Sequence, residues 1–425
     1  MNENLLHYVW KYRLFSNHHL TTTQGETIEI LSVGEHNPNA GPDFFNARIR
    51  CDKTILAGNI EVHTRSSDWR KHHHQKDKTY QNIILHVVYE DDEPILSTNH
   101  EALLTLVLKH RIPMIVLERY DDLQQLQPFI PCHQHWNTVD EFTKDRWLQR
   151  MVIERLETKC NTLELRLLET KNHWEEAFYI TLAHNFGFKL NAIPFELTAR
   201  QIPLTIFAKN KTNLFQIEAI IFGVAGFLND DRISEKYYLD LRKEYEYQKQ
   251  KYNFKEIDVT LWKFLRLRPA NFPHVRLAQF ANLIFRSGHL FSKIIESDNA
   301  QRMRQLFTCS ATLFWDTHYT FQEKSNKRKK QLGDEAIKII IINTVAPFLF
   351  LYGKTMMLPK LQDLALELLE ELPPEKNSIL AKWQALKTEL KNAARSQGLM
   401  HLKKQYCDTK LCLQCSVGLK ILKNE

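Results

Sequence analysis

Carboxylate and imidazole side chains gather in two neighbouring stretches near the start of the chain. Asp43 follows Pro42 at the beginning of one expected strand, and Glu61 and His63 lie two residues apart in the next strand. Residues two apart in a strand point to the same face, so Asp43, Glu61 and His63 are expected to converge. Two carboxylates that meet repel each other unless a cation lies between them, and hard divalent ions favour oxygen ligands. The pattern therefore predicts a site for Mg²⁺ or Mn²⁺.

A histidine-rich segment follows directly after this pair of stretches. His72, His74 and Asp77 are residue types that bind Zn²⁺, Mn²⁺ or Fe²⁺, and His86 stands alone in an apolar expected strand. A lone histidine in such a strand is more often a hydrogen-bonded core residue than a ligand. The alternative chemistry is a histidine-rich transition-metal site formed by His63, His72, His74, Asp77 and His86.

Three cysteines near the end of the chain form a second candidate site. Cys407, Cys412 and Cys415 have the spacing Cys-x4-Cys-x2-Cys. The last two are spaced like the chelating loop of a Zn²⁺ ion or an iron–sulfur cluster, and both groups take four ligands. The fourth ligand would be Cys132 or His401, either of which would hold the carboxyl terminus down. Free reduced thiols are the competing interpretation.

The elements expected around these residues divide the chain into two domains. Alternating and β-branched runs bounded by Gly, Pro, Asn and Asp predict strands, and apolar residues at helical spacing predict helices. We expect an α+β protein with an N-terminal α/β domain at 1–125, built on a mixed sheet, and a large all-α domain at 126–425. The expected strands are Thr27–Val33, Phe44–Arg50, Thr54–Thr64, Asn82–Tyr89 and Leu103–Leu108. The expected helices are Asn4–Phe15, Val139–Thr170, His173–Phe186, Asn213–Leu228, Ser234–Lys251, His274–Ser287, Asp334–Tyr352, Lys360–Glu371 and Asn377–Lys404.

Composition limits the classes of protein that the chain can belong to. The chain has 425 residues, of which 43% are hydrophobic, and this is longer than a domain with a single hydrophobic core. The length therefore predicts two or three compact units. The net charge of +7 permits nucleic acid as a partner without requiring it. The apolar stretch Ile339–Tyr352 is interrupted by polar residues and predicts a buried core helix, so no membrane association is expected. The start lacks the pattern of a secretory signal, and the seven cysteines form no disulfide framework, so we expect a cytoplasmic protein.

The pairing of Pro42-Asp43 with Glu61-x-His63 on the following strand resembles the restriction-endonuclease-like superfamily, known by its PD-(D/E)xK motif. The resemblance implies a core of helix-strand-strand-strand-helix-strand order that hydrolyses phosphodiesters with Mg²⁺. Asp43 and Glu61 would be the metal ligands, and His63 would replace the lysine. That histidine departs from the motif because imidazole is only partly charged near neutral pH and can itself ligate a metal. Lys53 on the neighbouring hairpin is a candidate for the missing cation, and no clear helix is expected between the later strands.

A second resemblance covers nearly the whole chain. Its landmarks are Leu6–Trp10, Asn39–Phe44, Gly58–His63, Trp69 with His72, His74 and Asp77, Glu218–Phe227, Arg268–Pro273 and the terminal cysteine trio. In these segments the chain is similar to a bacterial family known as domain of unknown function 2851. That resemblance implies no activity, so function rests on the side chains themselves.

Three functions fit the sequence. The first is a metal-dependent nuclease or phosphodiesterase acting on nucleic acid, with the helical domain positioning the substrate. The second is a non-enzymatic nucleic-acid-binding or scaffold protein with a degenerate nuclease-like domain, in which Asp43 caps a turn and Glu61 and His63 line an exposed strand face. The third is a hydrolase or oxygen-using enzyme with the histidine-rich site. Glycine-rich phosphate loops, dinucleotide fingerprints and serine nucleophile elbows are missing from the sequence, which disfavours nucleotide-driven work and serine hydrolysis. The oligomeric state is open.

Overall fold

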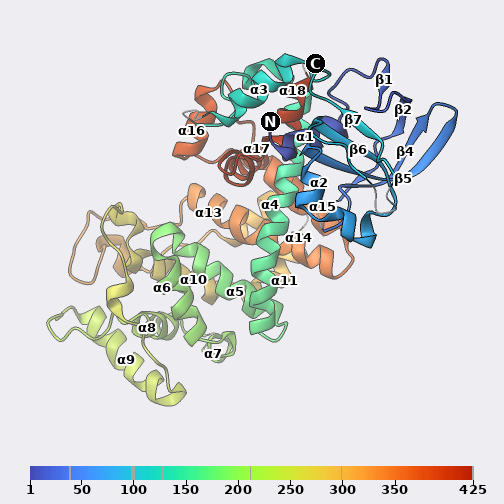
Figure 1. Ribbon diagram of the computed structural model, residues 1–425. Coiled ribbons are helices and arrows are strands. Elements are labelled where there is room, and N and C mark those ends of the chain that lie inside the picture. Colours follow the sequence, from blue (N-terminus) through green and yellow to red (C-terminus); the bar gives the residue numbers. More distant parts are fainter. Residues whose placement is uncertain (38–39, 97–100, 126–128, 211, 298, 424–425) are drawn as a thin grey trace. The chain divides into compact units, whose positions relative to one another are not determined.

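The structure, a computed structural model, describes the chain except for residues 38–39, 97–100, 126–128, 211, 298 and 424–425. It divides into two compact units (Figure 1). The first, here called the sheet unit, comprises Met1–Trp147 and Leu402–Glu425, and the second, the helical unit, comprises Leu148–His401. The sheet unit therefore extends past the expected boundary at residue 125. It also takes in the end of the chain, which the sequence had assigned to the helical domain.

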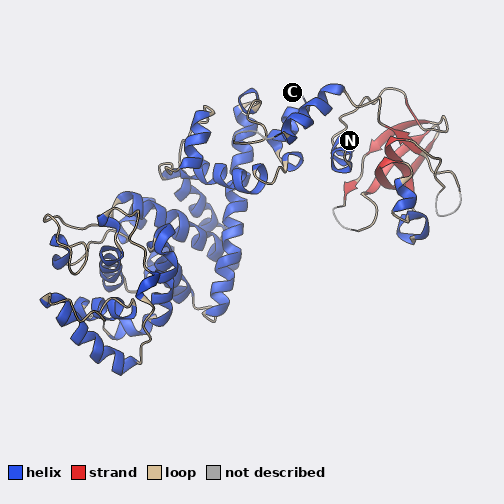
Figure 2. Ribbon diagram, turned by 60° about the vertical axis from the view of Figure 1, so that its left-hand side comes forward, coloured by secondary structure: helices blue, strands red, loops and turns tan. Residues whose placement is uncertain are grey.

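The strands of the described chain lie in one mixed, seven-stranded sheet (Figure 2). The order is β1-β2-β4-β5-β6-β7, with β3 paired to β4. Pairing is antiparallel from β1 to β5 and parallel from β5 to β7. All five expected strands are present, whereas the two-residue strands β1 and β3 are too short to leave a periodic pattern. The strands are β1 Leu20–Thr21, β2 Thr27–Ser32, β3 Glu35–His36, β4 Phe44–Cys51, β5 Thr54–Arg65, β6 Ile83–Glu90 and β7 Thr105–Val107.

Strand β5 is the centre of the sheet unit. A two-residue turn joins β4 to β5, and Asp52 in that turn adopts a left-handed backbone with φ of 48°, a conformation that Asp tolerates. The residues from Ile60 to His63 are all buried, so side chains on both faces of the strand are covered. In the parallel pairing of β5 with β6, Glu61 lies opposite His86. The register thus places these two polar side chains next to each other inside the fold.

Short helices complete the sheet unit. Helix α1 packs on β5, and the Asn2 side chain caps it by accepting a hydrogen bond from the Leu5 N–H. Helix α2 and two 3₁₀ turns at His74–Lys76 and Lys78–Tyr80 connect β5 to β6. The helices of this unit are α1 Glu3–Lys11, α2 Asp68–Lys71, α3 Met114–Gln124 and α18 Ser416–Lys423, and α4 Glu141–Glu169 begins in it.

The helical unit is built around one large apolar core. Its helices α8 and α9 approach closely where a β-carbon added to Gly223 would lie 2.1 Å from the Tyr245 ring. Besides the remainder of α4, its helices are α5 Trp174–Phe186, α6 Phe188–Gln201, α7 Leu204–Lys209, α8 Leu214–Val224, α9 Lys236–Tyr252, α10 Pro273–Arg286, α11 Leu290–Ile295, α12 Ala300–Leu306, α13 Asp334–Ile340, α14 Ala346–Thr355, α15 Pro359–Glu371, α16 Ser378–Ala385 and α17 Ala393–His401.

Several helical stretches differ from the sequence prediction, since α3, α6, α7, α11, α12 and α18 were not expected. The expected helix Asn377–Lys404 is broken between α16 and α17, where Lys387 adopts a left-handed backbone with φ of 60°. Among the unexpected helices, α6 contains Pro194 in its interior, a residue that disfavours a helix. The helix tolerates this proline through a kink at Asn191, whose side chain exchanges two hydrogen bonds with the backbone of Lys263. The break at Lys387 and the kink at Asn191 depend on tertiary contacts that a periodicity search does not detect.

The apolar stretch around Ile339–Tyr352 lies inside the helical unit. It forms α13 and α14, joined by a π-helical segment at Ile341–Val345. The combined segment Asp334–Thr355 is long and apolar enough to span a membrane, but 83% of its most apolar window is buried within the protein. Its burial is that of a core helix, as the interrupted apolar pattern predicts.

Candidate metal site

Three histidines of the sheet unit meet at one point. One ring nitrogen of each of His63, His72 and His74 lies within 4.8 Å of the others, and Nε2 of His63 is 3.1 Å from Nδ1 of His72. His63 comes from β5, while His72 follows α2 and His74 begins the next 3₁₀ turn. Between them His73 adopts a left-handed backbone with φ of 61° and is exposed. The chain therefore turns at His73, and the two flanking imidazoles face the sheet. We call His63, His72 and His74 the histidine trio.

Glu61 supplies an oxygen beside the histidine trio. Its Oε1 atom lies 3.1 Å from Nε2 of His74 and 3.5 Å from Nε2 of His63. The side chain is only 5% exposed, and burial raises its pKa to about 9, with the charge of Asp43 as the next contribution. A carboxylate buried in this way is stabilised by a cation. The Glu61 oxygen thus lies beside two members of the trio, His63 and His74.

Asp43 contacts Glu61 on the side away from the histidine trio. The Asp43 N–H donates to Oε2 of Glu61 at 3.2 Å, and Oδ2 of Asp43 accepts from the Val62 N–H at 2.9 Å. His7 of α1 places Nε2 3.3 Å from the same Oδ2. Burial lowers the pKa of His7, but the Asp43 carboxylate outweighs it and the pKa is raised. The structure therefore brings together Asp43, Glu61 and His63, and adds His7, which sequence reasoning missed.

A layer of aromatic rings lies behind the histidine trio. Nδ1 of His63 lies 2.8 Å from Nε2 of His86, which is fully buried. The Trp69 ring meets the His74 and His86 rings at centroid distances of 5.3 and 5.4 Å, and Tyr80 stacks on His74 at 3.9 Å. His86 is thus a partner of a trio member and not one of the trio. The sequence favoured a hydrogen-bonded core residue at this position, and the burial of His86 and its contact with His63 agree with that interpretation.

Burial keeps the inner imidazoles neutral. It lowers the pKa of His63 to about 2 and that of His86 to about 3, and in both cases neighbouring histidines lower it further. Burial also lowers the pKa of His74. A neutral imidazole is the form that ligates a metal. A metal on Nε2 of His63 requires the proton on Nδ1, which then donates to His86 and fixes the orientation of the ring.

Two residues singled out from the sequence lie elsewhere. Asp77 is exposed, and its side chain accepts a hydrogen bond from the Thr79 N–H at 2.9 Å, so it caps a 3₁₀ turn and is not in the group. Lys53 is exposed in the turn between β4 and β5. At about 3.3 Å per residue it lies roughly 25 Å along the strand from Glu61, so it does not supply the missing cation.

The donor set distinguishes among metal ions. Imidazole nitrogens suit Zn²⁺, Mn²⁺ and Fe²⁺, whereas Mg²⁺ prefers an octahedron of oxygens that includes several waters. The histidine trio with one oxygen of Glu61 therefore fits a transition metal better than the Mg²⁺ suggested by the two carboxylates. Of the ions named from the sequence, Mn²⁺, Zn²⁺ and Fe²⁺ fit this arrangement.

The cysteines singled out from the sequence form a separate group. Cys132 and the terminal trio of Cys407, Cys412 and Cys415 all belong to the sheet unit, and all are free thiols. His401, the other candidate for a fourth ligand, belongs to the helical unit and places Nε2 3.7 Å from Oε2 of Glu154. The structure thus groups Cys132, and not His401, with the terminal trio.

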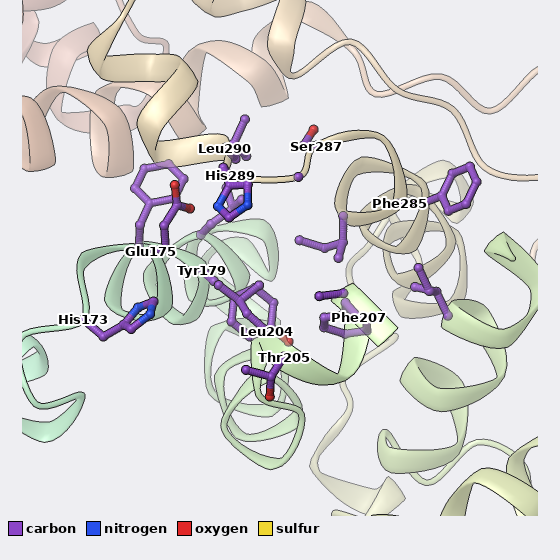
Figure 3. A pocket seen from close by; sticks show the side chains of 16 residues that line it. His173, Glu175, Tyr179, Leu204, Thr205, Phe207, Phe285, Ser287, His289 and Leu290 are labelled. Carbon is purple, nitrogen blue, oxygen red and sulfur yellow. The ribbon is translucent and has the colours of Figure 1, made fainter. Parts of the chain in front are cut away.

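The helical unit contains a cavity of about 410 Å³ (Figure 3). Its walls are mostly apolar, with Tyr179 and Phe207 among them. The Glu175 carboxylate at its edge accepts hydrogen bonds from the N–H groups of Phe291 and Ser292 at the start of α11. In the described ranges, no group of three metal-ligating side chains gathers there. The histidine trio is therefore the stronger candidate for chemistry.

The fold and the site together define a two-unit protein, with a mixed-sheet unit that carries a buried histidine cluster and a large helical unit. The chain belongs to the family described as Protein of unknown function (DUF2851), which matches residues 3–378. No curated protein and no solved structure matches the chain. Function therefore has to be inferred from the geometry of the site.

Proposed function

We propose that the protein is a metal-dependent phosphodiesterase or nuclease whose metal ion is held by the histidine trio and Glu61. The observation that carries the proposal is the convergence of the Glu61 carboxylate on two imidazoles of the trio, at 3.1 and 3.5 Å. A buried carboxylic acid among neutral imidazoles is a costly arrangement without a cation. A divalent ion would compensate that cost and would convert Glu61 to its carboxylate form.

The order of the elements supports phosphodiester chemistry. If the two-residue strands β1 and β3 are left aside, helix α1, strands β2, β4 and β5, helix α2 and strand β6 follow the helix-strand-strand-strand-helix-strand order of the restriction-endonuclease-like core. Asp43 directly precedes β4, and Glu61 and His63 lie on β5, which is the placement of the motif with His63 in place of its lysine. Helix α2 is short, but it occupies the place where the sequence indicated no helix. This agreement supports a nuclease-like reading of the sheet unit over other hydrolase classes.

Surface charge near the site supports an anionic substrate. Lys76 and Lys78 are exposed in the 3₁₀ turns that follow His74. His72 is the exposed member of the trio, so solvent and substrate reach the site from this side. Positive side chains at the mouth of a site attract phosphate groups and raise the rate of encounter. An anionic substrate such as a phosphodiester would meet these two lysines, which flank the exposed Asp77.

The side chains divide the work of hydrolysis. A bound metal ion would lower the pKa of a water molecule and polarise the phosphate. His63 and His74 are buried and hold the ion in place, while the exposed His72 leaves one side open to the substrate. His7 and Asp43 are partly exposed, with accessible fractions of 16% and 18%, and lie next to Glu61. From the side of Glu61 that faces away from the trio, they would hold the Glu61 carboxylate in position.

The test is a cleavage assay on the full-length protein with single- and double-stranded DNA and RNA. Mn²⁺, Zn²⁺ and Mg²⁺ are supplied separately, after removal of metal with a chelator. We expect cleavage with Mn²⁺ or Zn²⁺ and a loss of at least about 100-fold in Glu61→Gln and His72→Ala. His73→Asn is the matched control, since Asn tolerates the left-handed backbone and His73 lies outside the trio.

Three results would contradict the proposal. The first is full activity of His72→Ala, and the second is equal loss of activity in His73→Asn. The third is the failure of metal-loaded wild-type protein to cleave any of the four nucleic acids or a small phosphodiester. Nucleic-acid binding without cleavage would favour the non-enzymatic alternative.

A further inference from the structure

A buried arginine lies at the start of α10 in the helical unit. Arg276 is 8% exposed and belongs to the first turn of the helix, residues 273–276, which contains no acidic side chain. Its terminal nitrogens donate to the amide oxygens of Gln279 at 3.0 Å and Asn271 at 2.6 Å. The guanidinium lies over the Phe188 ring at 4.8 Å, and its buried Nε atom has no hydrogen-bond partner. Each of these partners is neutral, so none of them balances the positive charge.

A guanidinium in this position is costly without an anion. Burial lowers the pKa of Arg276 to about 10, and the positive end of the α10 dipole also disfavours a cation there. Two carboxylates lie near the same surface, but each faces another cation. Glu335 lies 2.6 Å from the Lys338 ammonium, and Asp334 lies 3.9 Å from the Arg304 guanidinium. An anionic ligand would supply the charge that Arg276 requires.

A second basic segment, residues 324–330, lies beside Arg276. Lys330 at its end is 6% exposed, and the Lys330 ammonium lies over the Tyr319 ring at 4.5 Å. The Gln279 side chain connects the two segments. Its amide oxygen accepts from Arg276, and its amide nitrogen donates to the Lys330 carbonyl at 3.0 Å. Two buried cations from distant parts of the chain are therefore held next to the same glutamine.

The two segments line adjoining pockets. Arg276 lines a pocket of about 690 Å³, and Lys330 and the exposed Arg328 line another of about 400 Å³. Each volume lies within the range of small-molecule sites, roughly 300–1,000 Å³. The pockets adjoin because they share the lining residues Ala270, Gln331 and Gly333. We call the two together the basic pocket.

We propose that the basic pocket binds the phosphate group of a nucleotide, either free or within a single strand of nucleic acid. Phosphate oxygens accept hydrogen bonds from guanidinium and ammonium groups, and the fork of an arginine matches their geometry. Phe188 and Leu267 give the larger pocket an apolar wall, which suits contact with a base. A nucleotide meets both requirements, since it joins a negative phosphate to a flat base.

This proposal goes beyond the nuclease function and does not rest on it. The residues of the basic pocket belong to the helical unit, whereas the histidine trio belongs to the sheet unit. Binding through arginine and lysine requires no metal ion. The two proposals can therefore be tested separately, by measuring nucleotide binding in the presence of a chelator.

The test is titration calorimetry of the chelator-treated, full-length protein. The probes are adenosine monophosphate, short single-stranded DNA and RNA oligonucleotides, and inorganic phosphate. We expect saturable binding of a nucleotide probe and an affinity at least about 10-fold lower in Arg276→Gln, as for the loss of a hydrogen bond to a charged group. The matched control is Arg286→Gln, which removes an exposed arginine at the other end of α10 and should keep the wild-type affinity. His72→Ala should keep it as well.

Arg328→Gln guards against a variant of Arg276 that fails to fold. Arg328 is exposed, so its replacement should leave folding intact, as checked by circular dichroism, and should weaken binding about 2–5-fold. Its control is Lys327→Gln, which removes another exposed cation of the same segment that does not line the basic pocket. Lys327→Gln should bind as the wild type does.

The probe that binds identifies the source of the phosphate. Binding of adenosine monophosphate indicates a free nucleotide, and binding of the oligonucleotides alone indicates a strand. Failure of the folded wild-type protein to bind any nucleotide probe, or binding of inorganic phosphate alone, would overturn the proposal. Wild-type affinity in every folded variant of Arg276 and Arg328 would overturn it as well.

Discussion

Transition-metal ions should raise the thermal stability of the sheet unit, and His72→Ala should remove that effect. His72 is the exposed member of the histidine trio, so its loss costs little packing while it removes one of the four donor atoms. Any ion that binds the native state alone stabilises it through mass action. The expected change therefore reports on the metal site itself and not on the surrounding core.

The magnitude follows from the size of the unit and from the binding equilibrium. An ion at 100 times its dissociation constant contributes about 2.7 kcal/mol to the free energy of unfolding. The sheet unit, Met1–Trp147 with Leu402–Glu425, belongs to the size class in which 1 kcal/mol shifts Tm by about 2–4 °C. Saturating Mn²⁺ or Zn²⁺ should therefore raise the Tm of the wild-type sheet unit by about 5–11 °C.

The assay is differential scanning calorimetry of chelator-treated protein, with each ion added separately. His73→Asn, which alters the neighbouring histidine outside the trio, should show the full wild-type shift. Mg²⁺ should give a much smaller shift, because the donor set is rich in nitrogen. An unshifted wild-type transition, an equal shift in His72→Ala, or an equal shift with Mg²⁺ would each refute the assignment of the trio and Glu61 as ligands.

Three further predictions address the metal site and the interior of the helical unit. His86→Ala leaves Nδ1 of His63 without its partner and should weaken metal binding, measured by titration calorimetry, about 10–100-fold; unchanged affinity would count against the role of His86. Burial raises the pKa of Glu218 from 4.5 to about 7, so between these values the native state keeps a proton that the unfolded chain has released. Stability in urea should therefore fall by about 3 kcal/mol as the pH rises from 4.5 to 7, and Glu218→Gln should flatten that slope. Gly223→Ala forces a β-carbon onto the Tyr245 ring and should cost about 1–3 kcal/mol in the same assay, whereas Gly333→Ala, with open space around it, should change stability little.

Much of the site was accessible from sequence because it lies on strands. Side chains alternate with a period of two in a strand, so the shared face of Glu61 and His63 follows from their spacing. The strand bounds follow from β-branched runs between turn residues, and the structure keeps them within a few residues. The segment Gly34–Phe44, which introduces Asp43, includes residues 38 and 39, which lie outside the described residues.

Other members of the site depended on contacts between distant segments. Nothing in the sequence identified His7 as a site residue. The partner of a histidine in an amphipathic helix is known only once α1 packs on β5. The choice among His72, His74, Asp77 and His86 depended on the turn at His73 and on the register of β5 with β6. Nearness in sequence did not decide membership of the site. Asp77 is only three residues from His74, yet it lies outside the histidine trio.

The sequence by itself determined the types and bounds of most elements and the presence of ligand-type side chains, since these depend on local periodicity and residue chemistry. Only the tertiary structure decided which ligands meet. It selected the histidine trio with Glu61, and it grouped Cys132 with the terminal cysteines by returning Leu402–Glu425 to the sheet unit. The physical reason is that strand register and the packing of distant segments arise from burial of the whole chain, which no local pattern encodes.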